Sequence, residues 1–358
     1  MAETKLGKDA VTLPVGTTAQ RPSNPEAGMI RFNTDRGFVE WYDPITDIWT
    51  SVAFDGGIVA TGGTVTDIEQ DGQLFRVHTF TSSGTFEVTR GGVVDCLIVA
   101  GGGGGGGSWR HSGDGGGGAG GVLEGNINVS PRQYQVVVGS GGEGGNQTFG
   151  SDRPEGEGGY YRAMPGGPSQ FGENLIADGG GYGGSRLNNS TADARGEDGG
   201  SGGGAGKGSS HTNVGGTGSP GQGHDGGATL GQSSVASDRA GAGGGGASDP
   251  GGDGDTNAGG NGGDGVSSTI TGQLVYYGGG GGGGHASSVT SNDDPRLGSG
   301  GLGGGGQGNA GNFDSVSVSH GAANTGGGGG GAGGDHQQDG NHGGNGGTGI
   351  VIVRYRIG

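Results

Sequence analysis

The stretch VVDCLIVAGGGGGGG at residues 93–107 decides how this chain folds. Its first half is an apolar run of the length and composition that favour a buried β-strand. Its second half has no side chains, and similar runs recur until the chain holds 106 Gly among 358 residues. Apolar residues make up only 27% of the total, too few for side-chain cores in proportion to this length. The glycine runs therefore either stay disordered or pack backbone against backbone.

Two familiar glycine-rich structures do not fit the pattern. Collagen needs Gly at every third position and abundant Pro, whereas this chain has 11 Pro and a local Gly-Gly-X pattern. A flexible linker is monotonous in Gly and Ser, whereas the loops between these runs carry His, Asp, Asn, Arg and aromatic residues. We therefore expect ordered rods.

Eleven glycine runs have similar lengths, as parallel rods in one bundle require. Seven residues at a polyproline-II rise of about 3.1 Å span about 22 Å, and this helix leaves its N–H and C=O groups free to bond neighbouring rods. Pure runs are expected inside the bundle, and runs with a side chain at every third residue, such as Ala258, Asn261 and Asp264, on its outside. The runs are 101–107, 115–121, 139–145, 179–184, 199–206, 241–247, 258–265, 278–284, 299–308, 326–334 and 343–349.

β-Strands are expected to clamp the rod ends. Phe75–Phe80 and Thr85–Thr89 predict a hairpin, and Ile350–Ile357 is expected to return beside Val93–Ala100, which closes one domain over residues 74–358. The predicted fold is all-β: a β-sandwich-like framework carrying about eleven antiparallel polyglycine-II rods. Essentially no α-helix is expected, because no stretch shows helical periodicity. Further strands are expected at Val122–Val129, Tyr134–Val138, Phe171–Ala177 and, as a pair, within Val266–Tyr277.

Residues 1–54 are expected to form a separate β-module, followed by a linker over 55–73. Met29–Asn33, Phe38–Tyr42 and Ile48–Val52 predict a three-stranded meander. So small a core does not support an independent domain, so we expect the module to trimerise or to dock on a partner. The residues expected in this core and interface are Ile30, Phe32, Trp41, Tyr42 and Trp49.

Charge and apolar content argue against several functions. The 35 Asp and Glu against 18 Lys and Arg give a formal net charge of −17, which disfavours binding to nucleic acid or to anionic membranes. No stretch approaches the roughly 20 apolar residues of a membrane helix, and Met1–Lys8 has no apolar segment of a secretory signal. The one cysteine, Cys96, is expected to be a buried thiol and not a nucleophile.

Counting alternate runs separates the two ends of the bundle. Run 101–107 leaves the strands and run 115–121 returns to them, so residues 108–114 are expected to form a tip at the far end. By the same count, 207–240 and 309–325 fall at the framework end. The other expected tips are 185–198, 248–257, 285–298, 335–342 and part of 146–168.

The tips are where we expect binding. Aromatic rings with Asn, Asp and Arg suit sugar rings and hydroxyl groups, and aromatics with Arg are favoured at protein interfaces. The alternative is that these loops are hydrophilic turns with no further role. The candidate residues are Trp109, Arg110, His111, Tyr160, Tyr161, Arg162, Arg186, Asn188, Asn189, His285, Asp293, Asp294, Arg296 and His336.

No catalytic or cofactor motif is indicated. Asp253 and Asp255 are spaced like the first ligands of a calcium loop, but Ala258 stands where that loop needs Gly. The loop histidines, including His336 and His342, fit solvated side chains better than a metal site. No Ser/His/Asp arrangement or carboxylate pair is recognisable. We expect no enzyme activity, no cofactor and no metal.

Several segments resemble bacteriophage proteins. Val94–Ala100 with the seven Gly after it, and Gly346–Tyr355, resemble the glycine-rich domain of phage tail proteins, over about residues 75–358. Residues 28–52 look like a short β-module of phage fibre proteins, and the architecture is similar to tail-tip adhesins of T-even-type phages. The resemblance implies a virion protein made in the host cytoplasm, often trimeric, that contacts other virion proteins.

Three functions follow from this resemblance and from the tips. The first is a tail fibre or adhesin that presents variable loops to a host-surface glycan or an outer-membrane protein. The second is a purely structural fibre or decoration subunit of neck, head or tail. The third is a cell-surface depolymerase, for which the residues offer no catalytic constellation.

Overall fold

A computed structural model describes most of the chain, and two compact units divide it, Met1–Gly57 and Ile58–Ile357. In the described part, no helix is long and apolar enough to cross a membrane. The described residues are 12–35, 38–45, 47–51, 57–107, 112–148, 159–185, 194–207, 213–230, 239–286, 295–310, 319–334 and 342–357.

The first unit is a four-stranded sheet in which the expected meander is present. Its strands lie in the order β1-β2-β3-β4, with β1 parallel to β2 and the other pairs antiparallel. Strand β1 and a 3₁₀ turn, η1, were not expected. The elements are β1 (Val15–Gly16), η1 (Thr18–Gln20), β2 (Ile30–Asn33), β3 (Phe38–Asp43) and β4 (Ile48–Ser51).

The buried face of this sheet is polar, which corrects the expected core. Glu40 is fully buried, receives hydrogen bonds from Arg21 (Nη2 to Oε2, 2.6 Å) and from Asn33 (Nδ2 to Oε2, 3.0 Å), and its pKa is lowered, chiefly by the Arg21 hydrogen bond. The segment that contains η1 and Arg21 covers this face. Side chains alternate between the two faces along a strand, so Ile30, Phe32 and Trp41 lie on the face opposite Glu40. Of the expected core residues, Tyr42 is buried, Ile30 is exposed, and Phe32, Trp41 and Trp49 are half-buried.

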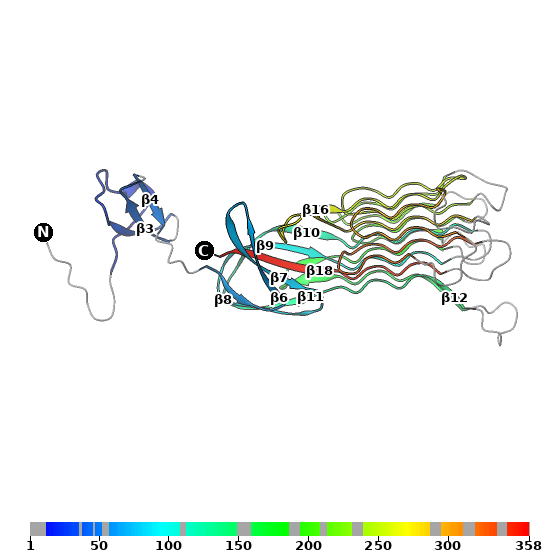
Figure 1. Cartoon of the computed structure of the whole chain (residues 1–358), viewed down its shortest axis with the longest axis horizontal. Coiled ribbons are helices and arrows are strands. Elements are labelled where there is room, and N and C mark those ends of the chain that lie inside the picture. Colours follow the sequence, from blue (N-terminus) through cyan, green and yellow to red (C-terminus); the bar gives the residue numbers. More distant parts are fainter. Residues whose placement is uncertain are drawn as a thin grey trace. The chain divides into compact units, whose positions relative to one another are not determined.

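The framework of the second unit is a sandwich of two five-stranded sheets, and Figure 1 labels most of their strands. The first sheet has the order β10 (Val122–Val129), β9 (Gly92–Val99), β18 (Ile350–Arg356), β7 (Gln73–Phe80) and β6 (Thr64–Gln70). The second has the order β15 (Leu175–Ala177), β14 (Ser169–Phe171), β11 (Arg132–Val137), β8 (Gly84–Arg90) and β5 (Val59–Thr61).

Apolar side chains fill both faces of the first sheet. Between the sheets, Phe86 and Phe171 of the second sheet pack with Val351 and Tyr355 of the first. The outer face of the first sheet is covered by a hairpin, which places Tyr277 in a second buried cluster. That hairpin, β16 (Val266–Ser268) with β17 (Val275–Tyr277), confirms the pair expected there.

Two expectations about the framework are wrong and one is confirmed. The hairpin expected from β7 and β8 does not form, because the chain crosses from one sheet to the other and Phe80 faces Phe86 across the core. The linker expected over 55–73 contains β5 and β6, because its apolar residues extend both sheets. Strand β18 does lie beside β9, with Ile350 opposite Val99.

Glycine-rich rods run side by side away from the framework (Figure 1). In rod 101–107, consecutive N–H groups donate in turn to three neighbouring rods, and every third residue returns to the same one: Gly102 donates to Gly347 and Gly105 to Gly344. The carbonyl groups accept from three other rods. No glycine of this rod has a φ in the positive range. This three-residue period is the one that polyglycine II requires, and polyglycine II is our interpretation of the rods.

Among the described residues, six rods form the interior of the bundle, and away from their ends they consist almost entirely of Gly and Ala. A Cβ atom at most of their glycines would overlap a backbone carbonyl oxygen of a neighbouring rod. Runs 101–107 and 278–284, which were expected inside, are buried throughout. The interior rods span 101–107, 113–121, 201–207, 239–247, 278–286 and 326–334.

Outer rods surround the interior ones, and we call their outward surface the wall. Asn261 is exposed while Ala258 and Asp264 are half-buried, as the three-residue spacing predicts for an outer rod. A short ribbon, β12 (Asn146–Thr148) with β13 (Gly159–Tyr161), extends two of these rods at the end away from the framework. The outer rods span 139–145, 162–168, 178–185, 194–199, 213–218, 224–230, 250–254, 258–265, 298–301, 305–310, 319–322 and 342–349.

The sequence count of eleven rods is too low. Several outer rods, such as 213–218 and 319–322, carry enough side chains to hide their glycine period. Run 299–308 is two rods, because a turn with positive φ at Gly303 and Gly304 reverses the chain.

These extra rods change which segments lie at the far end, which we call the distal end. Lys207 pairs with Gly113 beside the first tip, so the segment 207–240 is not confined to the framework end. Conversely, Ala247 donates to Gly278 directly after β17, so 248–257 begins at the framework end and is not wholly a tip. Each rod that the sequence count misses reverses the direction assigned to the rods after it, until a second missed rod restores the correct direction.

The segment 309–325 is corrected in the same way. The N–H of Asn309 donates to Gly331, and Asn309 accepts from His285, which places it at the distal end. The chain then returns along rod 319–322 to the framework end.

Candidate functional site

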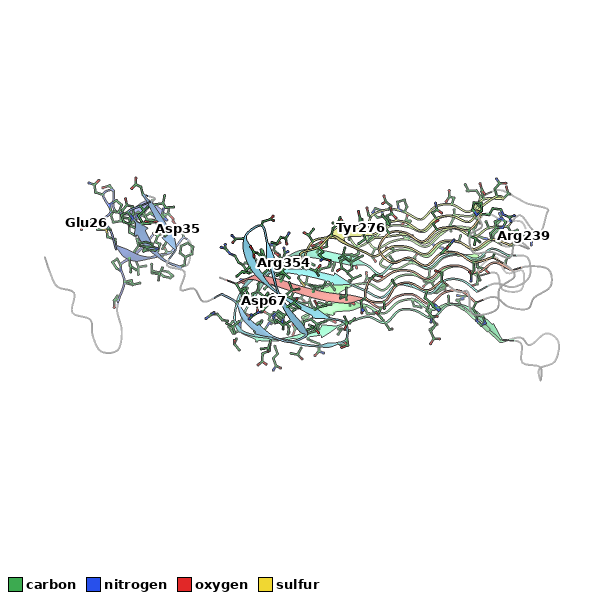
Figure 2. All side chains as sticks on the ribbon, viewed as in Figure 1. Glu26, Asp35, Asp67, Arg239, Tyr276 and Arg354 are labelled. Carbon is green, nitrogen blue, oxygen red and sulfur yellow. The ribbon has the colours of Figure 1, made fainter. Side chains whose placement is uncertain are left out.

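The distal end of the bundle is the candidate binding site. Figure 2 shows Arg239 at this end of the rods, with Arg354 and Asp67 in the framework at the other. The internal segments of the second unit that lie outside the described residues are 108–111, 149–158, 186–193, 208–212, 231–238, 287–294, 311–318 and 335–341.

A layer of buried polar side chains forms the base from which these segments depart. Asn213 donates from Nδ2 to the carbonyl of Gly206 (2.9 Å), and its N–H donates to Thr229 Oγ1 (3.1 Å). Burial lowers the pKa of Lys207, and the charge of Arg239 lowers it further. We call this set the distal polar layer, and it comprises Ser112, Asp114, Ser185, Lys207, Asn213, Thr229, His285 and Asn309. It places buried polar side chains at the ends of several rods.

The structure describes five of the predicted binding residues: His285, Arg296, Tyr160, Tyr161 and Arg162. His285 belongs to the distal polar layer and is 1% exposed, so it is a base residue and not an exposed tip residue; its backbone is held between two rods. Arg296 is half-buried, and its carbonyl accepts from Gly259 (2.7 Å). Tyr160 and Tyr161 lie on β13, where they pair with β12.

Arg162 is the last of these five, and the other predicted residues belong to the segments beyond the described rods. Arg162 begins an outer rod directly after β13 and is exposed. The others lie outside the described residues and are Trp109, Arg110, His111, Arg186, Asn188, Asn189, Asp293, Asp294 and His336.

Arg162 is part of a cluster on the wall that sequence analysis did not find. Its Nη1 donates to the hydroxyl of Tyr182 (3.0 Å), and its guanidinium carbon lies 5.7 Å from the centre of that ring. Burial raises the pKa of Tyr182, and a hydrogen bond with Glu197 raises it further, while Arg162 opposes both. The sequence signal was present, because an aromatic residue interrupts run 179–184 at an outward position.

Most polar side chains of the wall serve the lattice itself. An outer rod has N–H groups that face no further rod, and a carboxylate or amide of the adjacent rod accepts them. Asp225 Oδ1 accepts from Gly218 (2.8 Å), and Asp264 Oδ1 accepts from Leu302 (2.8 Å). The same contact is made by Asp198 to Thr217, Asp253 to Ala228, Asn261 to Ser299 and Asn345 to Gly144.

This arrangement also accounts for the residues considered as a calcium loop. Asp253 accepts from the N–H of Ala228 (2.7 Å), and Asp255 accepts from Asn257 and Ala258 (2.6 and 2.8 Å). These hydrogen bonds lower the pKa of Asp255. Within the described ranges, no three His, Cys, Asp or Glu side chains gather as a metal site requires.

Comparison with known proteins identifies the second unit. Residues 79–356 match the family described as Glycine-rich domain. The match begins within β7 and ends at the last residue of β18, so it covers most of the sandwich and all of the rods. No curated protein matches the chain.

Proposed function

The chain belongs to the glycine-rich domain family, and from that premise we propose that it is a phage tail fibre or adhesin whose distal end contacts a host-surface receptor. One observation carries the proposal. Rods clamped by a sandwich at one end bring many separate rod ends together at the other, around a layer of buried polar residues. Loops held by a rigid scaffold are the usual carriers of binding.

The lattice supports this function because it does not depend on the tips. Interior rods are held by backbone hydrogen bonds at nearly every residue, and wall rods by carboxylate and amide contacts. A change of sequence in the segments that lie outside the described rods, such as 108–111, removes none of the bonds named here. The acidic charge favours solubility of a body with little apolar surface.

The first unit supports a role in assembly. Ile30 is 44% exposed and Ile48 is 56% exposed on the sheet face that the segment around η1 leaves uncovered. Phe32 and Trp41 lie on the same face and are half-buried. We propose that further copies of the chain in a trimer, or another virion protein, cover this face, while Tyr42 and Trp49 support it from the opposite side.

The test compares tip and framework variants of the whole chain. Trp109→Ala, and the double change Tyr160→Ala with Tyr161→Ala, are expected to abolish binding of the purified chain to host cells and adsorption of the phage. Tyr276→Ala, a 39% exposed tyrosine in the framework hairpin, is the matched control and should bind as the unchanged chain does. Normal adsorption by both tip variants would refute the adhesin proposal and favour the structural subunit.

A further inference from the structure

Tyr182 is an unusual residue for a wall built from glycine. Among the described residues of the rods it is the one aromatic side chain, and it is half-buried. It lies on rod 178–185, between rods 162–168 and 194–199, and close to the distal end. Its own carbonyl accepts from Glu197 (3.0 Å), so the backbone at this position is fixed in the lattice.

The lattice does not require an aromatic ring here. At several other outward positions a short polar side chain accepts a backbone N–H, as Asp225 does from Gly218 and Asn345 from Gly144. The Tyr182 hydroxyl accepts instead from the guanidinium of Arg162. Burial raises the pKa of the phenol, and Glu197, whose N–H donates to the Tyr182 carbonyl from the adjacent rod, raises that pKa further. Hydrogen bonding between rods therefore does not explain why position 182 carries a tyrosine.

The cluster has the chemistry of a sugar site. Arg162 Nη1 donates to the hydroxyl of Tyr182 (3.0 Å), and the guanidinium carbon lies 5.7 Å from the centre of the ring. The positive charge of Arg162 therefore lies near the hydroxyl end of the ring and not over its centre. An aromatic ring offers an apolar surface for the C–H face of a pyranose. A guanidinium supplies only donors and a carboxylate only acceptors, so the pair can bind neighbouring hydroxyl groups, which both donate and accept.

We propose that Arg162, Tyr182 and Glu197 form a subsite for a neutral saccharide ring, on the wall next to the distal end. The charges of Arg162 and Glu197 offset each other at the subsite, and the chain as a whole carries a formal net charge of −17, so an anionic ring gains no net attraction there and an uncharged ring is favoured. The inference rests on the proposed function in one respect, that the distal end faces the cell.

The experiment uses the full chain and defined probes. Saturation-transfer NMR is recorded with methyl glycosides of glucose, galactose, mannose and N-acetylglucosamine at millimolar concentration, and with N-acetylneuraminate as the anionic contrast. We expect transfer to at least one neutral glycoside and none to N-acetylneuraminate. Tyr182→Ser should weaken that binding about tenfold, as loss of a ring contact predicts, without changing the melting temperature. Tyr182→Phe keeps the ring and should retain most of the binding.

Controls separate a binding role from a bracing role. Tyr276→Ser removes a half-exposed tyrosine at the framework end and should bind the glycosides as the unchanged chain does. If Tyr182→Ser lowers the melting temperature, a second variant, Arg162→Gln, tests the subsite, because it leaves the ring in place. Unchanged glycoside binding by Arg162→Gln would overturn the subsite. Absence of transfer to every neutral glycoside, or equal transfer by Tyr182→Ser, overturns it as well.

Cell binding measured in parallel distinguishes this inference from the proposed function. If the chain binds host cells but contacts none of the glycosides, the saccharide subsite is refuted while the adhesin proposal stands. If the chain binds neither cells nor glycosides, both are refuted.

Discussion

A methyl group at Gly105 would overlap the carbonyl oxygen of Gly330 on the neighbouring rod. Because both groups are backbone in a close lattice, neither can move without breaking hydrogen bonds of other rods. We predict that Gly105→Ala destabilises the second unit by about 3 kcal/mol or more, as overpacking of a rigid interior does. A scan of circular dichroism against temperature should show a melting point lower by about 5–10 °C.

The matched control is a glycine with space around it. Gly125 lies in β10, and a Cβ there would meet no atom within 4 Å. Gly125→Ala should leave the melting temperature unchanged or raise it slightly, because alanine restricts the unfolded chain. Equal effects of the two substitutions would contradict close packing of the rods.

Cys96 gives a second prediction for a single residue. Its thiol is 3% exposed within the sandwich, and burial raises its pKa to about 12. The folded protein should therefore not react with a thiol reagent at pH 8, and one thiol per chain should react after unfolding in guanidinium. Since the folded pKa lies above the unfolded value, the thiol favours folding below about pH 9, and this contribution is lost as the pH rises toward 12. Rapid labelling of the native chain would contradict the buried position.

Among the elements, wall rods depend on side-chain acceptors. Asp264 Oδ1 accepts the N–H of Leu302, and Asn261 makes the same contact to Ser299 with an amide oxygen (2.9 Å). Asp264→Asn keeps an acceptor and should be nearly neutral, whereas Asp264→Ala should cost about 1 kcal/mol and speed amide exchange at Leu302. Hydrogen-exchange NMR measures the exchange rate of the Leu302 amide directly. Unchanged exchange in the alanine variant would show that the carboxylate does not hold the neighbouring rod.

How far the elements could be predicted depends on whether a side-chain pattern marks them. Run 101–107 was identifiable because it is pure glycine, and β18 because it is an apolar run of β-branched residues. Rod 213–218 was missed because only its hydrogen bonds, and not its composition, identify it. The pairing of β7 and β8 was predicted wrongly, because short apolar strands joined by a turn fit a hairpin and a crossing between sheets equally well.

The candidate site shows the same limit. Arg162 was predicted from its neighbours in sequence, but its partners Tyr182 and Glu197 come from two other rods. Only the lattice brings these three residues together, since β14 and β15 separate Arg162 from Tyr182 along the chain and Glu197 belongs to a third rod. His285 was predicted in a tip from its polarity, yet it closes a rod and is buried. Sequence spacing identified the rod faces, but not which rods are neighbours.

At the scale of the whole molecule, the order of strands decides how the second unit closes. Strand β18 pairs with β9 on one side and β7 on the other, so the central position of the first sheet is filled by the last strand of the chain. Its side chains Val351, Val353 and Tyr355 enter the core between the sheets, while Ile350 and Ile352 enter the cluster on the outer face. Without β18, β7 and β9 have no common partner, and both cores lose their centre.

Removal of residues 350–358 should therefore prevent folding of the second unit, although every rod remains in the sequence. The purified truncated chain should be cleaved throughout by protease, because polyglycine rods held only by net bonds of about 1 kcal/mol each do not offset the entropy of ordering glycine without a clamp. Removal of residues 1–57 is the matched truncation. It deletes a separate compact unit and should leave a protease-resistant core that melts as the second unit of the full chain does. A resistant rod bundle in the chain lacking β18 would mean that the lattice is stable by itself and that the sandwich is not its clamp.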